Sequence, residues 1–364
     1  MHSGKAIIII GARQVGKTTL LKDSLQGNDK VLWMNGDNLE TRTLMANITV
    51  ERYRSMLEDN KIVVVDDAQR IENIGLKCKL LTDNFPDVQL IVTGSSSFDL
   101  ANKINEPLTG RKWEYKLFPL SYSELAAHYG AMQEWQKLPI RLVYGSYPDV
   151  VCNPGNEREI LNNITDSYLY KDVLIWERIK SPDKVLRLLQ ALAYQVGSEV
   201  STSELSRLVE LDRTTVEKYI NLLEQSQVIF RIGAFSRNLR SEIKSGRKIY
   251  FYDNGIRNAL IGNLSHLDAR ADVGALWENY MFSELLKKNS YGLTYARPYF
   301  WRTTQQQEID YIEECDGRMK AYEFKWNPAK KAKVSKTFLS AYPDVEVQTI
   351  NRENYMDFLS DKTE

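Results

Sequence analysis

The sequence is poor in the residues that build metal clusters and disulfide frameworks. It has three cysteines, Cys78, Cys152 and Cys315, among 364 residues, and no two of them have C-x-x-C spacing. This pattern argues against a structural zinc site or a disulfide scaffold and favours a reducing cytoplasm. No apolar run approaches the roughly 18 residues of a membrane span. We therefore expect a cytoplasmic protein without membrane contact.

The chain also has no net charge, because its 48 basic residues are balanced by 48 acidic residues. No global field draws such a chain to nucleic acid or to a membrane surface, so any such binding must come from a local patch. At 43% apolar residues, the chain is long enough for roughly two to four domains, each with its own core.

The most informative segment that is present is Gly11-Ala12-Arg13-Gln14-Val15-Gly16-Lys17-Thr18, which has the form G-x-x-x-x-G-K-[ST]. It follows an apolar run, and from Thr19 onward the sequence is typical of a helix. Strand, loop and helix in this order predict a phosphate-binding loop, whose backbone N–H groups surround the β-phosphate. We expect residues 11–19 to bind the nucleotide, Lys17 to reach the β- and γ-phosphates, and Thr18 to bind Mg²⁺.

A second part of a nucleotide site follows the apolar run 62–65, which ends in Asp66 and Asp67. Asp66 is expected to hold Mg²⁺, usually through water. Asp67 stands where a carboxylate would orient the attacking water. It is one methylene shorter than the glutamate that such ATPases commonly carry, which puts hydrolysis, rather than binding, in question.

Two further residues are candidates for sensing or stabilising the γ-phosphate. Ser95 follows the predicted strand that ends at Thr93, with Ser96 or a simple helix cap as alternatives. Arg111 precedes the next predicted strand. It is a candidate to stabilise the transferred phosphoryl group, within its own chain or across a subunit interface of an oligomer. The alternative is an ordinary surface arginine.

The order of predicted elements gives an α/β fold class and four regions. Alternating short apolar strands and helices predict a parallel sheet covered on both faces over residues 1–120, at strands 5–10, 30–35, 61–66, 88–93 and 112–117. We expect a helical lid over 121–180, a winged helix over 181–252, and a last α/β region over 253–364, with strands at 293–296, 299–303, 308–313 and 321–325.

The last region contains a set of charged residues with the order of a metal-dependent nuclease. Glu278 lies in a predicted helix, Asp310 in a predicted strand, and Glu323 and Lys325 in the next one. Glu323 and Lys325 share a strand face, which Asp310 on a paired strand can meet. Carboxylates that hold Mg²⁺ or Mn²⁺ beside a lysine suit phosphodiester cleavage. Alternating charge on an exposed strand is the other interpretation.

Charge along the predicted winged helix gives two opposite indications about DNA. The third helix region, residues 212–225, has two basic and three acidic residues, a net charge of −1. The segment 231–248 has six basic residues and one acidic residue, a net charge of +5. Phosphate contacts from that segment would be independent of sequence and sensitive to salt. A winged helix that only packs between its neighbours is the alternative.

In combination these motifs resemble the prokaryotic AAA+-type ATPases that carry a C-terminal winged helix and a PD-(D/E)XK nuclease-like domain. The resemblance also rests on Asp66-Asp67-Ala68-Gln69, Thr93-Gly94-Ser95-Ser96-Ser97, Leu108-Thr109-Gly110-Arg111, Phe118-Pro119-Leu120-Ser121, Gly145-Ser146-Tyr147-Pro148 and Tyr170-Lys171-Asp172-Val173. It implies a restriction-endonuclease-like fold for residues 253–364 and ATP as the nucleotide. Asp67 departs from the family's glutamate.

The sequence therefore predicts a Mg²⁺-dependent ATPase whose nucleotide cycle controls a winged-helix and nuclease-like module that contacts DNA. The alternative is a slow nucleotide-gated switch or scaffold that acts through protein partners and has an inactive nuclease-like domain.

Overall fold

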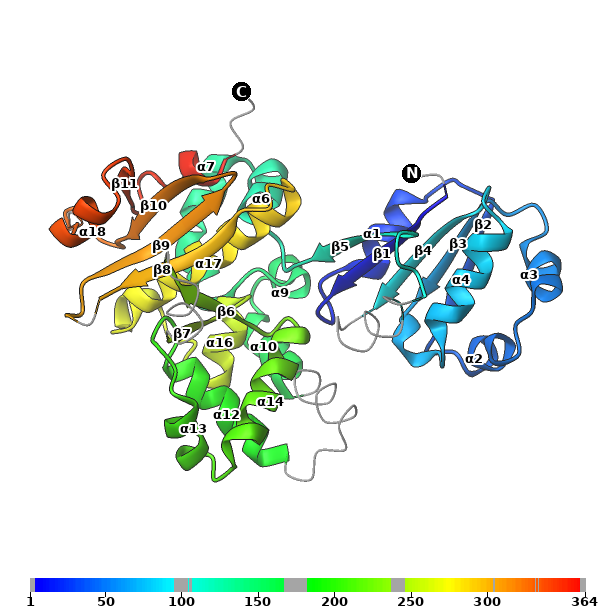
Figure 1. Ribbon diagram of the computed structural model, residues 1–364, viewed down its shortest axis with the longest axis horizontal. Coiled ribbons are helices and arrows are strands. Elements are labelled where there is room, and N and C mark those ends of the chain that lie inside the picture. The colour runs from blue at the N-terminus through cyan, green and yellow to red at the C-terminus, as the bar shows by residue number, and fades with distance from the viewer. Residues whose placement is uncertain are drawn as a thin grey trace. The chain divides into compact units, whose positions relative to one another are not determined.

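The computed structural model describes residues 4–94, 104, 107–166, 182–236, 246–303, 305–330, 332 and 334–360. The chain divides into two compact units, one of residues 1–118 with 225–227 and one of residues 119–224 with 228–364. Each unit has a sheet of its own (Figure 1). Among the helices of the described residues, none combines the length and the apolar character that crossing a membrane requires.

The first unit is built on a five-stranded sheet of order β2-β3-β4-β1-β5, in which every neighbouring pair is parallel. Its elements are β1 (Ala6–Gly11), α1 (Lys17–Ser24), β2 (Val31–Asn35), α2 (Leu39–Ala46), α3 (Val50–Leu57), β3 (Ile62–Asp66), η1 (Ala68–Arg70), α4 (Ile74–Asn84), β4 (Gln89–Gly94) and β5 (Lys112–Leu117). All five predicted strands are confirmed to within one residue at each end, and so is the parallel sheet.

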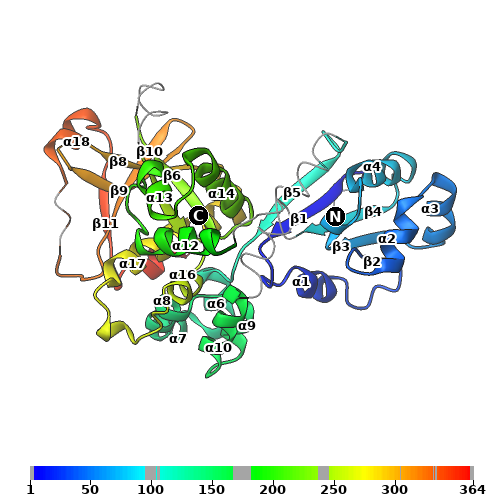
Figure 2. The ribbon, with the colours of Figure 1, turned by 90° about the horizontal axis from the view of Figure 1, so that it is seen from below.

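Both faces of this sheet are covered by helices, as continuous apolar strands require. Ile8 and Ile10 of β1 belong to a core cluster that includes side chains of α2, α3 and α4. Ile9 points the other way and packs with Leu21 and Leu25, at α1. Figure 2 shows α1 on one face of the sheet and α3 and α4 on the other. The carboxyl ends of the strands are thereby fixed beside the start of α1.

The second unit begins with helices and ends with a mixed sheet. Its elements are α6 (Tyr122–Tyr129), α7 (Ala131–Gln136), α8 (Leu138–Tyr144), α9 (Pro148–Cys152), α10 (Glu157–Ile164), α12 (Pro182–Tyr194), α13 (Thr202–Leu208), α14 (Arg213–Gln225), β6 (Ile229–Ala234), β7 (Arg247–Phe251), α16 (Asn254–Leu260), η3 (Leu267–Ala269), α17 (Val273–Tyr291), β8 (Arg297–Arg302), β9 (Glu308–Cys315), β10 (Arg318–Phe324), α18 (Lys336–Ala341), β11 (Val347–Ile350) and α19 (Tyr355–Leu359).

The sheet of the second unit has six strands in the order β11-β10-β9-β8-β6-β7. Aromatic rings attach α17 to it, because Phe282 stacks on Tyr250 of β7 at a centroid distance of 4.0 Å and meets Tyr311 and Phe324 edge-on. A separate apolar cluster contains Trp301 of β8 together with Phe338 of α18. The sheet therefore holds α17 against the strands that carry the predicted C-terminal carboxylates.

Three of the four strands predicted for the last region correspond to β8, β9 and β10, whereas the strand predicted at 293–296 is wrong. Leu293 and Tyr295 have φ values of 50° and 53°, and a left-handed backbone at two positions breaks an extended strand. The segment is a turn and coil between α17 and β8. The strand β11 was not predicted.

The elements expected for the winged helix are present as α12, α13, α14, β6 and β7. However, β6 pairs with β8 as well as with β7, so one sheet runs across the predicted boundary between residues 252 and 253. The division into lid, winged helix and nuclease-like domain stays a prediction.

A sharp corner at Gly145 joins α8 to α9. Gly145 has φ 73° and ψ −159°, a conformation that is essentially restricted to glycine. A Cβ atom there would lie 2.0 Å from Asp253 Oδ1. The buried Asp253 carboxylate accepts hydrogen bonds from the backbone N–H of Ser146 at 2.7 Å and of Ile256 at 3.1 Å. Asp253 thus caps α16 and fixes the corner at once.

We expect Gly145→Ala to lower the free energy of unfolding of the second unit by at least about 2 kcal/mol, since it adds a clash to backbone strain. The measurement is urea denaturation followed by circular dichroism. Gly130→Ala is the matched control, because Gly130 also has a positive φ of 91° but nothing within 4 Å of its would-be Cβ. Equal losses in the two variants would show that the contact with Asp253 contributes nothing.

Candidate nucleotide site and C-terminal pocket

The predicted phosphate-binding loop lies between β1 and α1, at the carboxyl edge of the first sheet. Gln14 and Gly16 have φ values of 62° and 96°, so the chain turns back on itself before the helix begins. The helix starts at Lys17, which places Lys17 and Thr18 in its first turn. The first N–H groups of a helix are not used within the helix and form the positive end of its dipole, a favourable place for phosphate.

The Lys17 side chain is folded into the loop. It is 7% exposed, and its ammonium donates hydrogen bonds to the carbonyl oxygens of Gly11 at 2.9 Å and of Ala12 at 2.8 Å. Gly11 lets β1 approach β5 closely, since a Cβ there would lie 2.5 Å from the Leu117 carbonyl oxygen. The cation is therefore held by the loop that would receive the phosphates.

Asp66 ends β3 and is 5% exposed. Its Oδ2 accepts a hydrogen bond from the Thr18 hydroxyl at 2.7 Å, and its Oδ1 accepts one from the Thr93 hydroxyl. The structure thus brings together the two residues expected to bind Mg²⁺. A hydroxyl oxygen and a carboxylate are ligands that suit this ion, which keeps several waters of its own. The residues present fit a magnesium ion bound with the nucleotide.

Asp67 follows in a left-handed conformation, with φ 47° and ψ 42°. Its N–H donates to the Thr93 hydroxyl oxygen at 3.2 Å, and its Oδ1 accepts a hydrogen bond from the Gln69 amide nitrogen at 3.1 Å. The backbone therefore turns sharply after β3, and the side chain of Gln69 fixes the direction of the Asp67 carboxylate.

Thr93 and Gln69 are the residues that sequence reasoning missed at this site. Thr93 is fully buried at the end of β4 and is bonded to both Asp66 and Asp67. Gln69 is 7% exposed. The signal for Thr93 was present in the sequence, as a hydroxyl at the end of an apolar strand next to the Asp66 strand. Ser95, the residue predicted to sense the γ-phosphate, lies outside the described residues.

Arg111 is not brought to the phosphate-binding loop of its own chain. It precedes β5, which pairs in parallel with β1 so that Lys112 is opposite Ala6 and Leu117 is opposite Gly11. Arg111 therefore lies at the amino edge of the sheet, roughly 17 Å along β1 from the loop. Its guanidinium pairs with Asp83 at 2.6 Å. The register excludes the role within the chain, and the role across an interface stays a prediction.

The C-terminal residues Glu278, Asp310, Glu323 and Lys325 line one pocket of about 840 Å³ in the second unit. Lys325 Nζ lies 3.1 Å from Asp310 Oδ2 and 2.6 Å from Glu323 Oε2. Burial, and next the charge of Asp310, raise the pKa of Glu323 to about 7. The strand pattern predicts that Asp310, Glu323 and Lys325 meet, and in the structure they line one pocket together with Glu278.

The same pocket contains two charged residues that were not predicted, Lys248 of β7 and Glu308 at the start of β9. Lys248 Nζ lies 3.2 Å from Glu278 Oε1 and also contacts Glu308 Oε1. Burial, followed by the charge of Asp310, raises the pKa of Glu278 against the opposing effect of Lys248. Within the described residues, no three Asp, Glu, His or Cys side chains are grouped closely enough to hold a metal ion.

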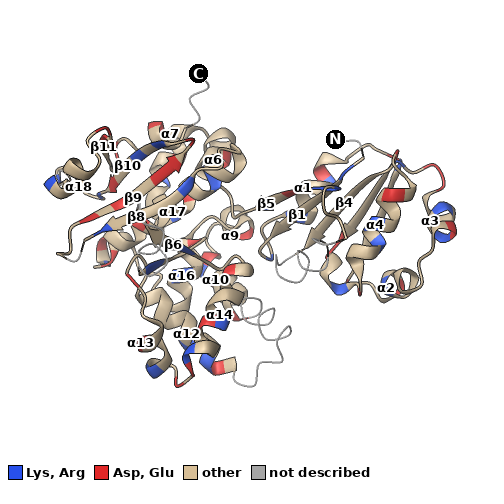
Figure 3. Ribbon diagram, viewed as in Figure 1, with Lys and Arg blue, Asp and Glu red and all other residues tan. Residues whose placement is uncertain are grey.

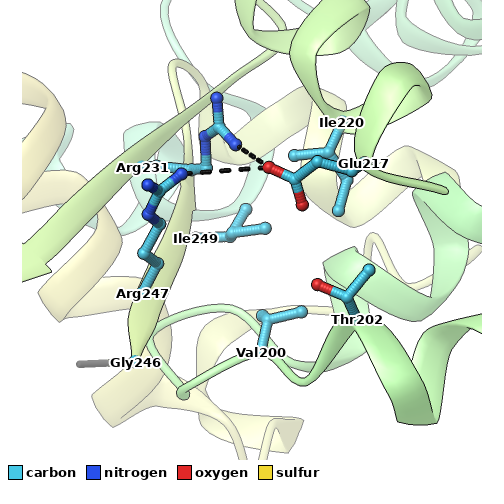
Figure 4. A pocket seen from close by; sticks show the side chains of 8 residues that line it. All are labelled: Val200, Thr202, Glu217, Ile220, Arg231, Gly246, Arg247 and Ile249. Atoms are coloured by element: carbon cyan, nitrogen blue, oxygen red, sulfur yellow. Dashed lines mark hydrogen bonds and ion pairs between the residues drawn. The ribbon is translucent and has the colours of Figure 1, made fainter. Parts of the chain in front are cut away.

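The basic segment 231–248 is only partly available to a partner. Figure 4 shows Arg231 and Arg247 both directed at Glu217 of α14, across a pocket of about 310 Å³. Arg231 lies 2.7 Å from Glu217 Oε1 and also pairs with Glu224, whereas Arg247 is 3.8 Å from Glu217 and half exposed. Lys248 is buried. The remaining basic residues of this segment, Arg237, Arg240 and Lys244, lie outside the described residues.

Several curated relatives resemble most of the chain. An uncharacterized protein of Mycobacterium tuberculosis is 24% identical over 355 residues, which cover 95% of this chain and 76% of the relative. An uncharacterized protein of Haemophilus influenzae is 25% identical over 328 residues, covering 84% of this chain and 78% of the relative.

Solved structures share less with the chain. A DNA polymerase III γ-subunit-related protein of Thermotoga maritima has a TM-score of 0.23 and 14% identity, covering 62% of this chain and 96% of that one. The Drosophila ORC bound to DNA has a TM-score of 0.26 and 13% identity, covering 71% of this chain and 90% of that one. Superpositions at this level carry no argument about function.

Three regions of the chain match protein families. Residues 136–267 match a domain of unknown function, DUF8612, and residues 273–357 match another, DUF4143. Neither match assigns an activity, so the nuclease-like fold stays a proposal. Residues 3–126 match the family described as AAA domain. Together with the loop and the parallel sheet, this match makes the N-terminal unit similar to nucleotide-binding domains of the AAA type.

Proposed function

We propose that this protein binds ATP with Mg²⁺, hydrolyses it slowly, and uses the nucleotide cycle to control its second unit. The observation that carries the proposal is the 2.7 Å contact between the Thr18 hydroxyl and Asp66 Oδ2, beside a lysine buried in a phosphate-binding loop. Few other tasks would require a buried carboxylate, a hydroxyl and an ammonium to meet at the start of a helix.

In this proposal Lys17 neutralises charge on the phosphates, and Thr18 and Asp66 hold the magnesium ion. The ion would polarise the γ-phosphate and offset the charge that develops on it. Asp67 orients the attacking water. Its carboxylate reaches less far than a glutamate and is held by Gln69 at 3.1 Å, which is why we expect turnover to be slow.

Contact with DNA is a separate part of the proposal and concerns the basic segment 231–248. Figure 3 shows basic and acidic residues interspersed along the ribbon of both units. Of the charges counted in the segment 231–248, Arg231 is paired with two carboxylates and Lys248 is buried with two others. DNA binding therefore depends on Arg237, Arg240, Lys244 and the half-exposed Arg247.

The same ion pairs favour a second candidate function, a nucleotide-gated switch that acts through protein partners. A recognition surface for DNA needs cations that can release counterions on binding to phosphates, and cations already bound to carboxylates do not. The switch would use the same ATP site, with no cleavage by the second unit.

Steady-state ATP hydrolysis with Mg²⁺, measured with and without linear duplex DNA, tests both candidates. We expect Lys17→Ala to reduce the rate at least about 100-fold, because it removes a preorganised charge from the transition state. An undiminished rate in this variant would refute the ATPase proposal. Stimulation by DNA supports a DNA-coupled machine, whereas a slow rate indifferent to DNA supports the switch.

Asp67→Asn should separate binding from hydrolysis. The amide is close in size to the carboxylate but cannot accept a proton from water, so we expect kcat to fall about 100-fold or more. The Kd for a fluorescent ATP analogue should change less than about threefold, because Asp67 is not assigned to the phosphates or the metal. A parallel loss of nucleotide affinity would show that Asp67 has a different role.

Thr93→Val should lower kcat and raise the Mg²⁺ concentration needed for half-maximal activity, because it removes a donor to Asp66 and an acceptor for Asp67. The expected loss in kcat is about tenfold or more, the usual size for a disturbed outer ligand shell. Thr93→Ser keeps the hydroxyl and should restore most of the activity. If Thr93→Val and Thr93→Ser have the same kcat and the same Mg²⁺ requirement, the hydroxyl does not position the carboxylates.

A further inference from the structure

The C-terminal pocket contains a buried cation that belongs to the protein. Lys248 is 3% exposed. Its ammonium touches Glu308 Oε1, lies 3.2 Å from Glu278 Oε1, and is 5.3 Å from the centroid of the Phe300 ring. The ammonium thus joins carboxylates from α17 and β9. A buried charge is tolerated only when it is paired in this way.

The protein's own donors also occupy the three carboxylates that the sequence suggested as metal ligands. Glu278 Oε1 accepts the Tyr250 hydroxyl at 2.6 Å in addition to Lys248. Asp310 Oδ2 accepts the backbone N–H of Phe324 at 2.8 Å and Lys325 at 3.1 Å. Glu323 Oε2 lies 2.6 Å from Lys325. Each predicted ligand therefore already has a positively charged partner.

These contacts do not fit a three-carboxylate metal centre of the nuclease type. Magnesium and manganese require several oxygen ligands that converge on one point at about 2.1 Å. In this pocket an ammonium stands between Glu278 and Glu308, and a second one stands between Asp310 and Glu323. A divalent ion entering between α17 and β9 would meet the like charge of Lys248 in a place shielded from solvent.

We propose that Lys248 is the resident cation of this pocket and occupies the place that a divalent metal would take between Glu278 and Glu308. The nuclease-like part of the second unit then has no metal-assisted cleavage, and its carboxylates serve to hold β7, α17 and β9 together. This inference is independent of the ATPase proposal, because it concerns the second unit alone and requires no nucleotide.

The proposal predicts that removal of Lys248 creates a metal site. Lys248→Ala removes the ammonium shared by Glu278 and Glu308, and leaves only the Tyr250 hydroxyl on Glu278 and Arg302 at 3.8 Å from Glu308. The two mostly buried carboxylates then attract another cation. We expect this variant to bind one Mn²⁺ per chain at least about tenfold more tightly than the unaltered chain. The measurement is a Mn²⁺ titration followed by electron paramagnetic resonance on the full-length, nucleotide-free protein. This variant and the parent with which it is compared both carry Thr18→Ala and Asp66→Asn, so that neither residue assigned to the magnesium ion of the nucleotide site can bind Mn²⁺.

Lys330→Ala is the matched control. Lys330 lines the same pocket but is exposed, so the loss of its charge is screened by water and should leave Mn²⁺ binding unchanged. If both variants gain the same affinity for Mn²⁺, the gain comes from the change in net charge alone, and the proposal is overturned. If Lys248→Ala does not fold, as judged by circular dichroism, Lys248→Met keeps the apolar stem and takes its place in the titration.

Two further results would overturn the proposal. One is stoichiometric, micromolar Mn²⁺ binding by the chain that retains Lys248, abolished by Glu278→Gln. The other is a Lys248 variant that folds and binds Mn²⁺ no more tightly than the parent. Hydrolysis of ATP could be normal or absent in either case, so failure here is distinguishable from failure of the proposed function.

Discussion

The hydrogen bond between Thr18 and Asp66 is the interaction on which the first unit depends. These residues come from α1 and from β3, and the strand order β2-β3-β4-β1-β5 places β4 between β3 and β1. The bond therefore spans a strand, and β4 contributes Thr93 to the opposite oxygen of the same carboxylate. Three elements meet at one buried charge. This geometry exists only because the apolar strands are parallel and end at the same edge.

In the second unit, buried ion pairs hold structural elements together. Glu284 and Lys287 of α17 pair at 2.7 Å with both side chains almost fully buried. Glu284 also accepts the backbone N–H of Tyr122, and Lys287 donates to the carbonyl oxygen of Leu120. The start of α6 is thereby tied to α17. Lys248 of β7 and Glu278 of α17 form a second ion pair, which joins the helix to the sheet. Ion pairs with buried lysines therefore add to the aromatic packing that holds α17 in place.

The sequence predicts the first unit well because its signals are local. Each strand is a short apolar run, and the loop motif is contiguous, so the position of Thr18 relative to Asp66 follows from a parallel sheet. In the last region local signals predict β8, β9 and β10 but fail at other points. The apolar residues near Leu293 suggested a strand, but left-handed backbone there makes a turn. Lys248 and Glu278 form an ion pair although they are 30 residues apart in the sequence. Periodicity and motif spacing do not predict a contact between residues so far apart in the chain.

This difference explains why charge counted along a segment is a poor guide to nucleic-acid binding. The net charge of +5 over residues 231–248 treats every lysine and arginine as available. Arg231 and Lys248 are instead neutralised by carboxylates from α14, α17 and β9. Ion pairs with carboxylates from distant segments neutralise positive charge that appears as a local excess in the sequence. Basic residues indicate a partner only after the carboxylates that the fold brings to them have been subtracted.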